Sequence, residues 1–67
     1  MKNSIKVERA RNSITQAKLA EMTQVSRQTI NAIELGKYVP SALLALRLAN
    51  IFNVAVEEIF QLEEGEM

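Results

Sequence analysis

Apolar residues recur along the chain at intervals of three and four, with polar residues between them, and this spacing predicts helices rather than strands. Glycine occurs at two positions and proline at one, so few residues interrupt a helix. A chain of 67 residues is the length of one small domain. We therefore expect an all-α fold, with residues 1–67 forming a single compact domain of five helices joined by tight turns.

The helix boundaries are predicted from capping and stop signals. Ser4, Thr15, Ser26 and Ser41 each precede a periodic run, and Ser and Thr are favoured at helix N-caps. Gly36 can end the third helix in a left-handed turn. The expected helices are residues 4–12, 16–23, 26–35, 41–53 and 56–60, followed by a flexible tail at 61–67.

The same periodicity predicts which side chains form the core. The fourth helix, ALLALRLANIF, is apolar on more than one face and should lie at the centre of the domain. The other expected core residues lie in the first three helices and in the turn after the first: Ile5, Val7, Ala10, Ile14, Leu19, Ala20, Met22, Ile30 and Ile33.

Composition argues against an enzyme. The chain has no Cys, no His and no Asp, so a disulfide, a thiolate zinc site and the commonest general base are all missing. Glu57 and Glu58 are explained as acids in the first turn of a helix, where the macrodipole favours them. We expect no catalytic residue, no cofactor and no metal site.

Charge is neutral overall but divided along the chain. Residues 1–47 hold eight Lys and Arg against three Glu, a net charge of +5, while residues 48–67 carry −5. One end of the molecule could therefore face phosphate, although a neutral domain with a solvated acidic tail fits the same numbers. No run of 18 apolar residues occurs, so we expect a soluble cytoplasmic protein without membrane contact.

Residues 16–35 have the form of two short helices with a turn between them. Such a pair can place one helix across a phosphate backbone and the next in the major groove of DNA. With Ile30 and Ile33 facing inward, four polar side chains point outward from the start of the second helix: Arg27, Gln28, Thr29 and Asn31. Arg, Gln and Asn can bond base edges directly, and the Thr methyl can touch a thymine methyl, so these are predicted base-contacting residues.

The run TQAKLAEMTQVSRQTINAIELGKYVPS resembles the phage repressor and Cro (XRE-type) helix-turn-helix regulators, especially their smallest free-standing repressors. TQ-x-x-LA, VS-x-x-TI and IE-x-GK-x-x-P at fixed spacing carry the likeness. It implies a five-helix lambda-repressor-like domain that binds double-stranded DNA in the prokaryotic cytoplasm, on the nucleoid. The resemblance also implies phosphate contacts from Gln16, Ser26, Lys37, Tyr38 and Lys18. It further implies that Gln16 braces the recognition helix, and that Arg9 and Glu34 form a structural ion pair.

These residues can also be explained without a role in DNA binding. The side chains of Arg27, Gln28 and Asn31 could be ordinary solvated groups, and Gln16 could serve only to begin its helix. Three positions depart from the family pattern. Gln24 replaces the glycine of the turn, Ala55 replaces a capping Ser or Thr, and Glu8 replaces a core leucine. Either the first helix rotates to bury Val7 and Ala10, or Glu8 lies at the surface or pairs with a base.

The apolar residues near the C-terminal end exceed what a small core can absorb, and surplus apolar surface usually marks an interface. We expect a homodimer that presents two recognition helices to DNA. The residues predicted at its interface are Leu43, Val56, Ile59, Phe60 and Leu62. Alternatively, the last helix only closes the core. The acidic, apolar C-terminal end also leaves open a DNA-binding antitoxin or interaction module that grips a protein partner there, and a restriction-system controller would have the same sequence features.

Overall fold

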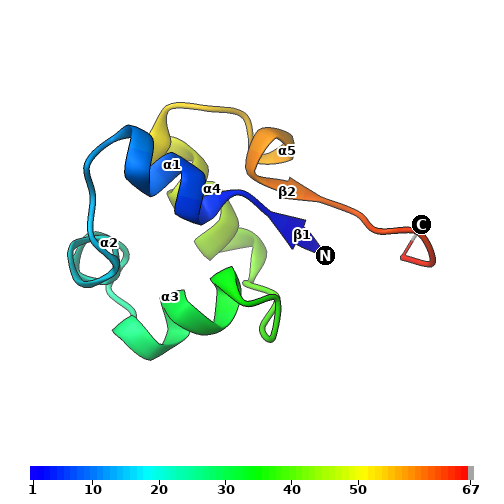
Figure 1. The fold of residues 1–67 in the computed structure, drawn as a ribbon, viewed down its shortest axis with the longest axis horizontal. Coiled ribbons are helices and arrows are strands. Elements are labelled where there is room, and N and C mark those ends of the chain that lie inside the picture. Colours follow the sequence, from blue (N-terminus) through cyan, green and yellow to red (C-terminus); the bar gives the residue numbers. More distant parts are fainter. Residues whose placement is uncertain (67) are drawn as a thin grey trace.

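The computed structural model describes residues 1–66 and is built mainly of helices (Figure 1). A short strand at each end of the chain accompanies them. In chain order the elements are β1 (Lys2–Asn3), α1 (Ile5–Arg11), α2 (Gln16–Thr23), α3 (Arg27–Glu34), α4 (Ala42–Phe52), α5 (Val56–Ile59) and β2 (Phe60–Gln61). The five predicted helices are thus present, each within a few residues of its expected bounds.

Three of the four predicted N-caps make the bond that defines a cap. The hydroxyls of Thr15, Ser26 and Ser41 accept from the backbone N–H three residues later, at 3.0, 3.1 and 3.2 Å. Each bond satisfies an N–H that has no partner within its own helix. Ser4 is the exception, because its hydroxyl donates to the carbonyl of Glu58 at 3.1 Å instead.

Left-handed residues end or separate several helices. Gly36 has φ 75° and follows α3, where the N–H of Lys37 returns to the carbonyl of Ala32 at 2.9 Å. Asn53, with φ 56°, ends α4 in the same way. Gln24, with φ 60°, takes the left-handed position between α2 and α3 without being glycine. Only glycine adopts this conformation without a steric penalty, so Gln24 carries strain.

The buried apolar residues form one cluster to which all five helices contribute. They are Ile5, Leu19, Ala20, Ile30, Ile33, Leu44, Leu48, Ala49, Phe52 and Ile59. More of them come from α4 than from any other helix, as its breadth of apolar positions predicts. The prediction that Met22 faces the core was wrong, and so was the alternative in which the first helix buries Val7 and Ala10. Val7 is 54% exposed, Met22 and Ala10 are exposed as well, and each lies on the outer face of its helix.

Glu8, and not Val7 or Ala10, is the residue that α1 turns inward beside Ile5. Its exposed fraction is 6%, and its carboxylate accepts from Arg11 Nη1 at 2.7 Å. The helix therefore does not rotate to bury Val7. Of the alternatives, the structure contains the one in which Glu8 pairs with a basic residue, here Arg11.

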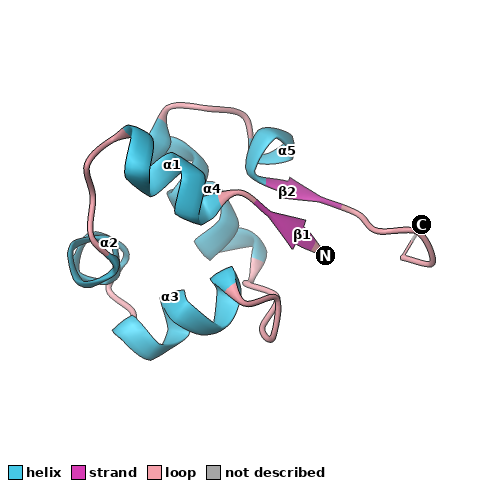
Figure 2. Ribbon diagram, viewed as in Figure 1, coloured by secondary structure: helices cyan, strands magenta, loops and turns pink. Residues whose placement is uncertain are grey.

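The strands β1 and β2 join the two ends of the chain, which the sequence did not predict. They pair antiparallel with Lys2 opposite Gln61 and Asn3 opposite Phe60 (Figure 2). Gln61, the first residue of the tail expected to be flexible at 61–67, thus lies in a strand, while the flexibility of the tail stays a prediction. Beyond Gln61, Glu66 Oε2 accepts from the amino group of Met1 at 2.9 Å. Met67, the last residue of the predicted tail, lies outside the described residues.

The start of α5 is stabilised despite the alanine at its cap. The backbone N–H of Ala55 donates to Glu58 Oε2 at 2.9 Å, so the acid supplies one half of a capping arrangement that a Ser or Thr would complete.

Within residues 1–66, no helix has both the length and the hydropathy needed to cross a membrane. In the same part of the chain, the glutamates, which are the potential metal ligands of the His, Cys, Asp and Glu types that the sequence contains, form no group of three that could hold a metal ion.

Candidate nucleic-acid interface

The turn between α2 and α3 is short and fixed at three points. Gln24 reverses the chain in its left-handed conformation, and the N–H of Val25 donates to the carbonyl of Ala20 at 3.1 Å. Ser26 then caps α3. Because Val25 is half-buried against the core, the start of α3 is held in one place relative to α2.

The α3 helix divides into a buried and an exposed face. Ile30 and Ile33 are fully buried, while Arg27, Gln28 and Asn31 are exposed near its start. These three side chains and that of Gln16 line one surface hollow. Thr29 differs from its neighbours, because it is half-buried and its hydroxyl lies 2.9 Å from that of Ser26. Its methyl group remains the part suited to a thymine.

An ion pair ties α1 to the end of α3. Arg9 Nε donates to Glu34 Oε2 at 2.6 Å, and Arg9 Nη2 donates to Glu34 Oε1 at 3.2 Å. The side chains are 16% and 8% exposed. Arg9 Nη1 also donates to the carbonyl of Ile14 at 3.1 Å, so the guanidinium fixes the α1–α2 loop as well. Two parallel bonds of this kind set geometry as well as energy.

Gln16 extends this network to the exposed face of α3. Its Nε2 donates to Glu34 Oε1 and to Asn31 Oδ1, both at 3.1 Å. Both amide hydrogens therefore have acceptors within the protein. The first backbone N–H groups of a helix have no partner inside it, so the start of α2 still offers donors to a phosphate from its main chain.

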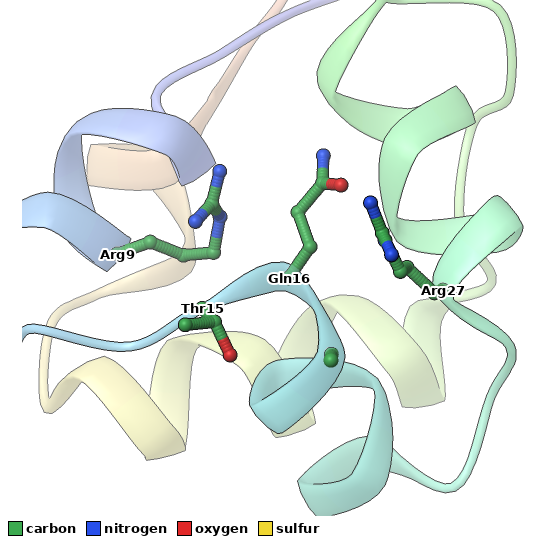
Figure 3. Close-up of a pocket in the computed structure, with 5 residues that line it drawn as sticks. Arg9, Thr15, Gln16 and Arg27 are labelled. Carbon is green, nitrogen blue, oxygen red and sulfur yellow. The ribbon is translucent and has the colours of Figure 1, made fainter.

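Two guanidinium groups flank the start of α2. A second hollow is lined by Arg9, Thr15, Gln16, Ala17 and Arg27. Arg9, Gln16 and Arg27 project to the same side, with Gln16 standing between the two arginines (Figure 3). The charge of Arg9 is paired with Glu34, so Arg27 is the guanidinium that makes this helix N-terminus a favourable environment for an anion.

The other predicted phosphate contacts lie at the surface around this face. Lys37 and Tyr38 are exposed in the loop that follows α3, and Ser26 is exposed at the start of α3. Lys18 is exposed on α2, but its Nζ lies 3.6 Å from Glu21 Oε1, a carboxylate that competes with phosphate for its charge.

The predicted dimer residues differ in their availability to a partner. Leu43 and Leu62 are 60% and 59% exposed, and Val56 and Phe60 are half-buried. The prediction that Ile59 lies at the dimer interface was wrong, because its exposed fraction is 0% and it belongs to the core. Its side chain is covered by the rest of the domain and cannot contact a second molecule directly.

Two contacts of this region were missed from the sequence. The first is Asn31 as the residue that Gln16 bonds, since the resemblance implied only that Gln16 braces α3. The second is the bond from Asn3 Nδ2 to the carbonyl of Ile33 at 2.7 Å, which ties β1 to the end of α3. The residues of the second pair are 30 positions apart. No local pattern joins residues at such separations, so only the folded chain brings them together.

Comparison with known proteins supports one family. The family model HTH_3, described as helix-turn-helix, matches residues 5–59. An uncharacterized HTH-type transcriptional regulator of Bacillus subtilis, YgzD, is 52% identical over 64 residues, which cover 96% of this chain and 97% of that protein. One from Methanocaldococcus jannaschii is 52% identical over 66 residues, covering 98% and 100%. One from Archaeoglobus fulgidus is 43% identical over 67 residues, covering 100% and 94%.

Proposed function

The chain belongs to the helix-turn-helix family of DNA-binding transcriptional regulators, a non-enzymatic class, and we propose that it is a repressor that binds a pseudo-palindromic operator as a homodimer. The observation that carries the proposal is the two-sided α3 helix. Ile30 and Ile33 anchor it in the core, and Arg27, Gln28 and Asn31 stand exposed on its other side. A helix held this way can enter the major groove with its N-terminal side chains toward the bases.

The base contacts would come from the first turns of α3. Arg27 can donate two parallel hydrogen bonds to guanine, and Gln28 can bond both groups of adenine. Asn31 follows one turn later, and the methyl of Thr29 can meet a thymine methyl. Each good pair of bonds discriminates against a wrong base by about 1–3 kcal/mol.

Phosphates would bind at both ends of this face. The main-chain N–H groups of Gln16 and Ala17, with the guanidinium of Arg27 on the same hollow, suit one phosphate. Ser26, Lys37 and Tyr38 would contact others, with Lys18 contributing less because Glu21 is beside it. Such contacts fix the position of the protein on the duplex and carry no sequence information themselves.

A homodimer is proposed because one module of this size contacts only a few base pairs. Leu43 and Leu62 are the most exposed of the residues suited to the interface, with Val56 and Phe60 beside the core. Leu35 and Glu63 line a third hollow, so the end of α3 lies close to the segment after β2. A dimer that reads two half-sites one turn of duplex apart would present its two recognition helices about 34 Å apart.

We propose repression because a dimer bound at a promoter would block access to it. A dimer of two such domains, each formed by residues 1–67, would cover a promoter that contains the operator and exclude polymerase from it. The protein would act in the prokaryotic cytoplasm, on the nucleoid.

The test combines stoichiometry with transcription. Sedimentation should give two protomers per operator duplex for the wild type, and fewer for Leu43→Asp combined with Leu62→Asp. Val7→Asp, another exposed apolar position, is the matched control and should leave dimerisation unchanged. In transcription with purified polymerase, adding the protein should lower the output of a promoter that contains the operator. Monomeric binding would contradict the dimer, and raised output would contradict repression.

A further inference from the structure

We infer that Gln16 fixes the amide of Asn31 so that Asn31 offers hydrogen-bond donors to DNA, and therefore selects guanine over adenine at the base it faces. The inference rests on the proposed DNA-binding function and deepens it. Asparagine in a major groove is commonly paired with adenine, because its amide can donate to N7 and accept from the N6 amino group at once. That pairing requires the amide oxygen and nitrogen both to face the base.

The direction of the hydrogen bonds in this network is forced by charge. An ionised carboxylate only accepts, so the atom of Gln16 that lies 3.1 Å from Glu34 Oε1 must be its nitrogen. The two bonds from Arg9 hold that carboxylate in place.

The same nitrogen of Gln16 then decides how Asn31 is turned. It lies 3.1 Å from an amide atom of Asn31, and because it donates, that atom must be the oxygen. With Oδ1 bonded to Gln16, the Nδ2 group is the end of the amide that is left for DNA. Asn31 is exposed and lines the hollow that it shares with Gln16, Arg27 and Gln28, so its side chain belongs to the face proposed to contact bases.

A donor group distinguishes the purines in the major groove. Guanine presents two acceptors there, O6 and N7, whereas adenine presents N7 beside an amino group that is itself a donor. The N–H groups of Asn31 can bond both acceptors of guanine, but they oppose the amino group of adenine. Gln16 is thus a positioning residue that sets base preference from outside α3.

The experiment measures relative affinities for an operator duplex and its single-base variants, with the wild type, Asn31→Ala and Gln16→Met. Asn31→Ala identifies the base concerned, as the one position in each half-site where preference is lost. There, the wild type should favour guanine over adenine by about tenfold. Gln16→Met removes the donor, so the amide can turn and bond adenine by both groups. The guanine-to-adenine ratio should then fall about tenfold while other positions keep their preferences.

If Gln16→Met weakens binding equally across all sequences and leaves the guanine-to-adenine ratio unchanged, the inference is overturned. Adenine preferred by the wild type at this position would also overturn it. If Gln16→Met does not fold, Asn31→Asp tests the same point, because aspartate accepts from Gln16 and offers a second acceptor to DNA, so the preference should move to cytosine. Gln28→Ala is the control and should change a different base. A protein that selects no sequence would refute the proposed function itself, which is a separate outcome.

Discussion

Arg9 Nε lies 2.6 Å from Glu34 Oε2, and this contact joins the first helix to the last turn of α3 across 25 residues of sequence. The carboxylate also accepts from Gln16, so the three side chains link α1, α2 and α3. Together they hold α3 at a defined angle to the rest of the domain. The position of the base-reading side chains therefore depends on a small, partly buried charge network.

Breaking this pair should destabilise the protein strongly. Arg9→Ala leaves the carboxylate of Glu34 in a site that is 8% exposed, and stranding a buried charge costs on the order of 3 kcal/mol. Chemical denaturation measures the loss. Lys18→Ala, which breaks the exposed pair with Glu21, is the control and should cost less than about 0.5 kcal/mol. Equal losses for the two variants would show that the Arg9–Glu34 contact contributes little.

Glu8 and Arg11 should respond unequally to replacement. Glu8 is buried and Arg11 is exposed, so Arg11→Ala leaves an unpaired buried carboxylate at a cost of about 1–3 kcal/mol. Glu8→Leu removes the buried charge and leaves only an exposed arginine, so its free energy of unfolding should lie within about 1 kcal/mol of the wild type or above it. Thermal unfolding compares them. A larger loss for Glu8→Leu than for Arg11→Ala would contradict the assignment.

Gln24→Gly should stabilise the protein. A left-handed residue other than glycine costs about 1–2 kcal/mol, and the greater freedom of glycine in the unfolded chain returns part of that gain. A net increase of about 0.5–1 kcal/mol is expected in the free energy of unfolding. Gln28→Gly makes the same exchange in right-handed α3 and should lower it by about 1 kcal/mol. The prediction fails if both variants lose stability alike.

The contact between Met1 and Glu66 should depend on pH in both directions. The bond to Glu66 raises the pKa of the Met1 amino group above its ordinary value of 8.0. Its contribution is complete below pH 8.0 and is lost as pH rises through the raised pKa. The same bond lowers the pKa of Glu66 below 4.5, so that contribution is complete above pH 4.5 and is lost as pH falls through the lowered pKa.

Nuclear magnetic resonance can follow this contact through the amide of Glu63, which donates to Glu66 Oε1 at 2.7 Å. The signal should be constant between about pH 4.5 and 8 and change outside that window. Acetylation of the Met1 amino group should abolish the alkaline change and keep the acid one. An alkaline change that survives acetylation would assign it to another group.

Much of the fold was predictable because its signals are local. Thr15, Ser26 and Ser41 cap helices through bonds that span three residues, and Gly36 and Asn53 end helices through their own backbone preference. The inward positions of Leu19, Ile30 and Ile33 follow from helical spacing alone. Such features need no knowledge of the tertiary structure.

The errors concern side chains and segments whose place is decided by distant partners. Val7 and Glu8 are adjacent, and which of them turns inward depends on how α1 meets the core and on Arg11 as a partner for the acid. The β1–β2 pairing joins the two ends of the chain, where no periodicity could indicate it. Ile59 carries the same apolar signal whether it faces α4 or a second protomer, so spacing could not separate core from interface.

Selection of bound duplexes from a random pool at physiological salt tests the central claim most directly. The wild type should enrich an inverted repeat with half-sites about one helical turn apart, and Arg27→Ala combined with Gln28→Ala should lose that preference while staying folded. The claim would be contradicted if no motif emerges, or if binding is weak, steeply salt-dependent and unchanged by the two substitutions. A protein partner at the C-terminal end would then become the leading interpretation.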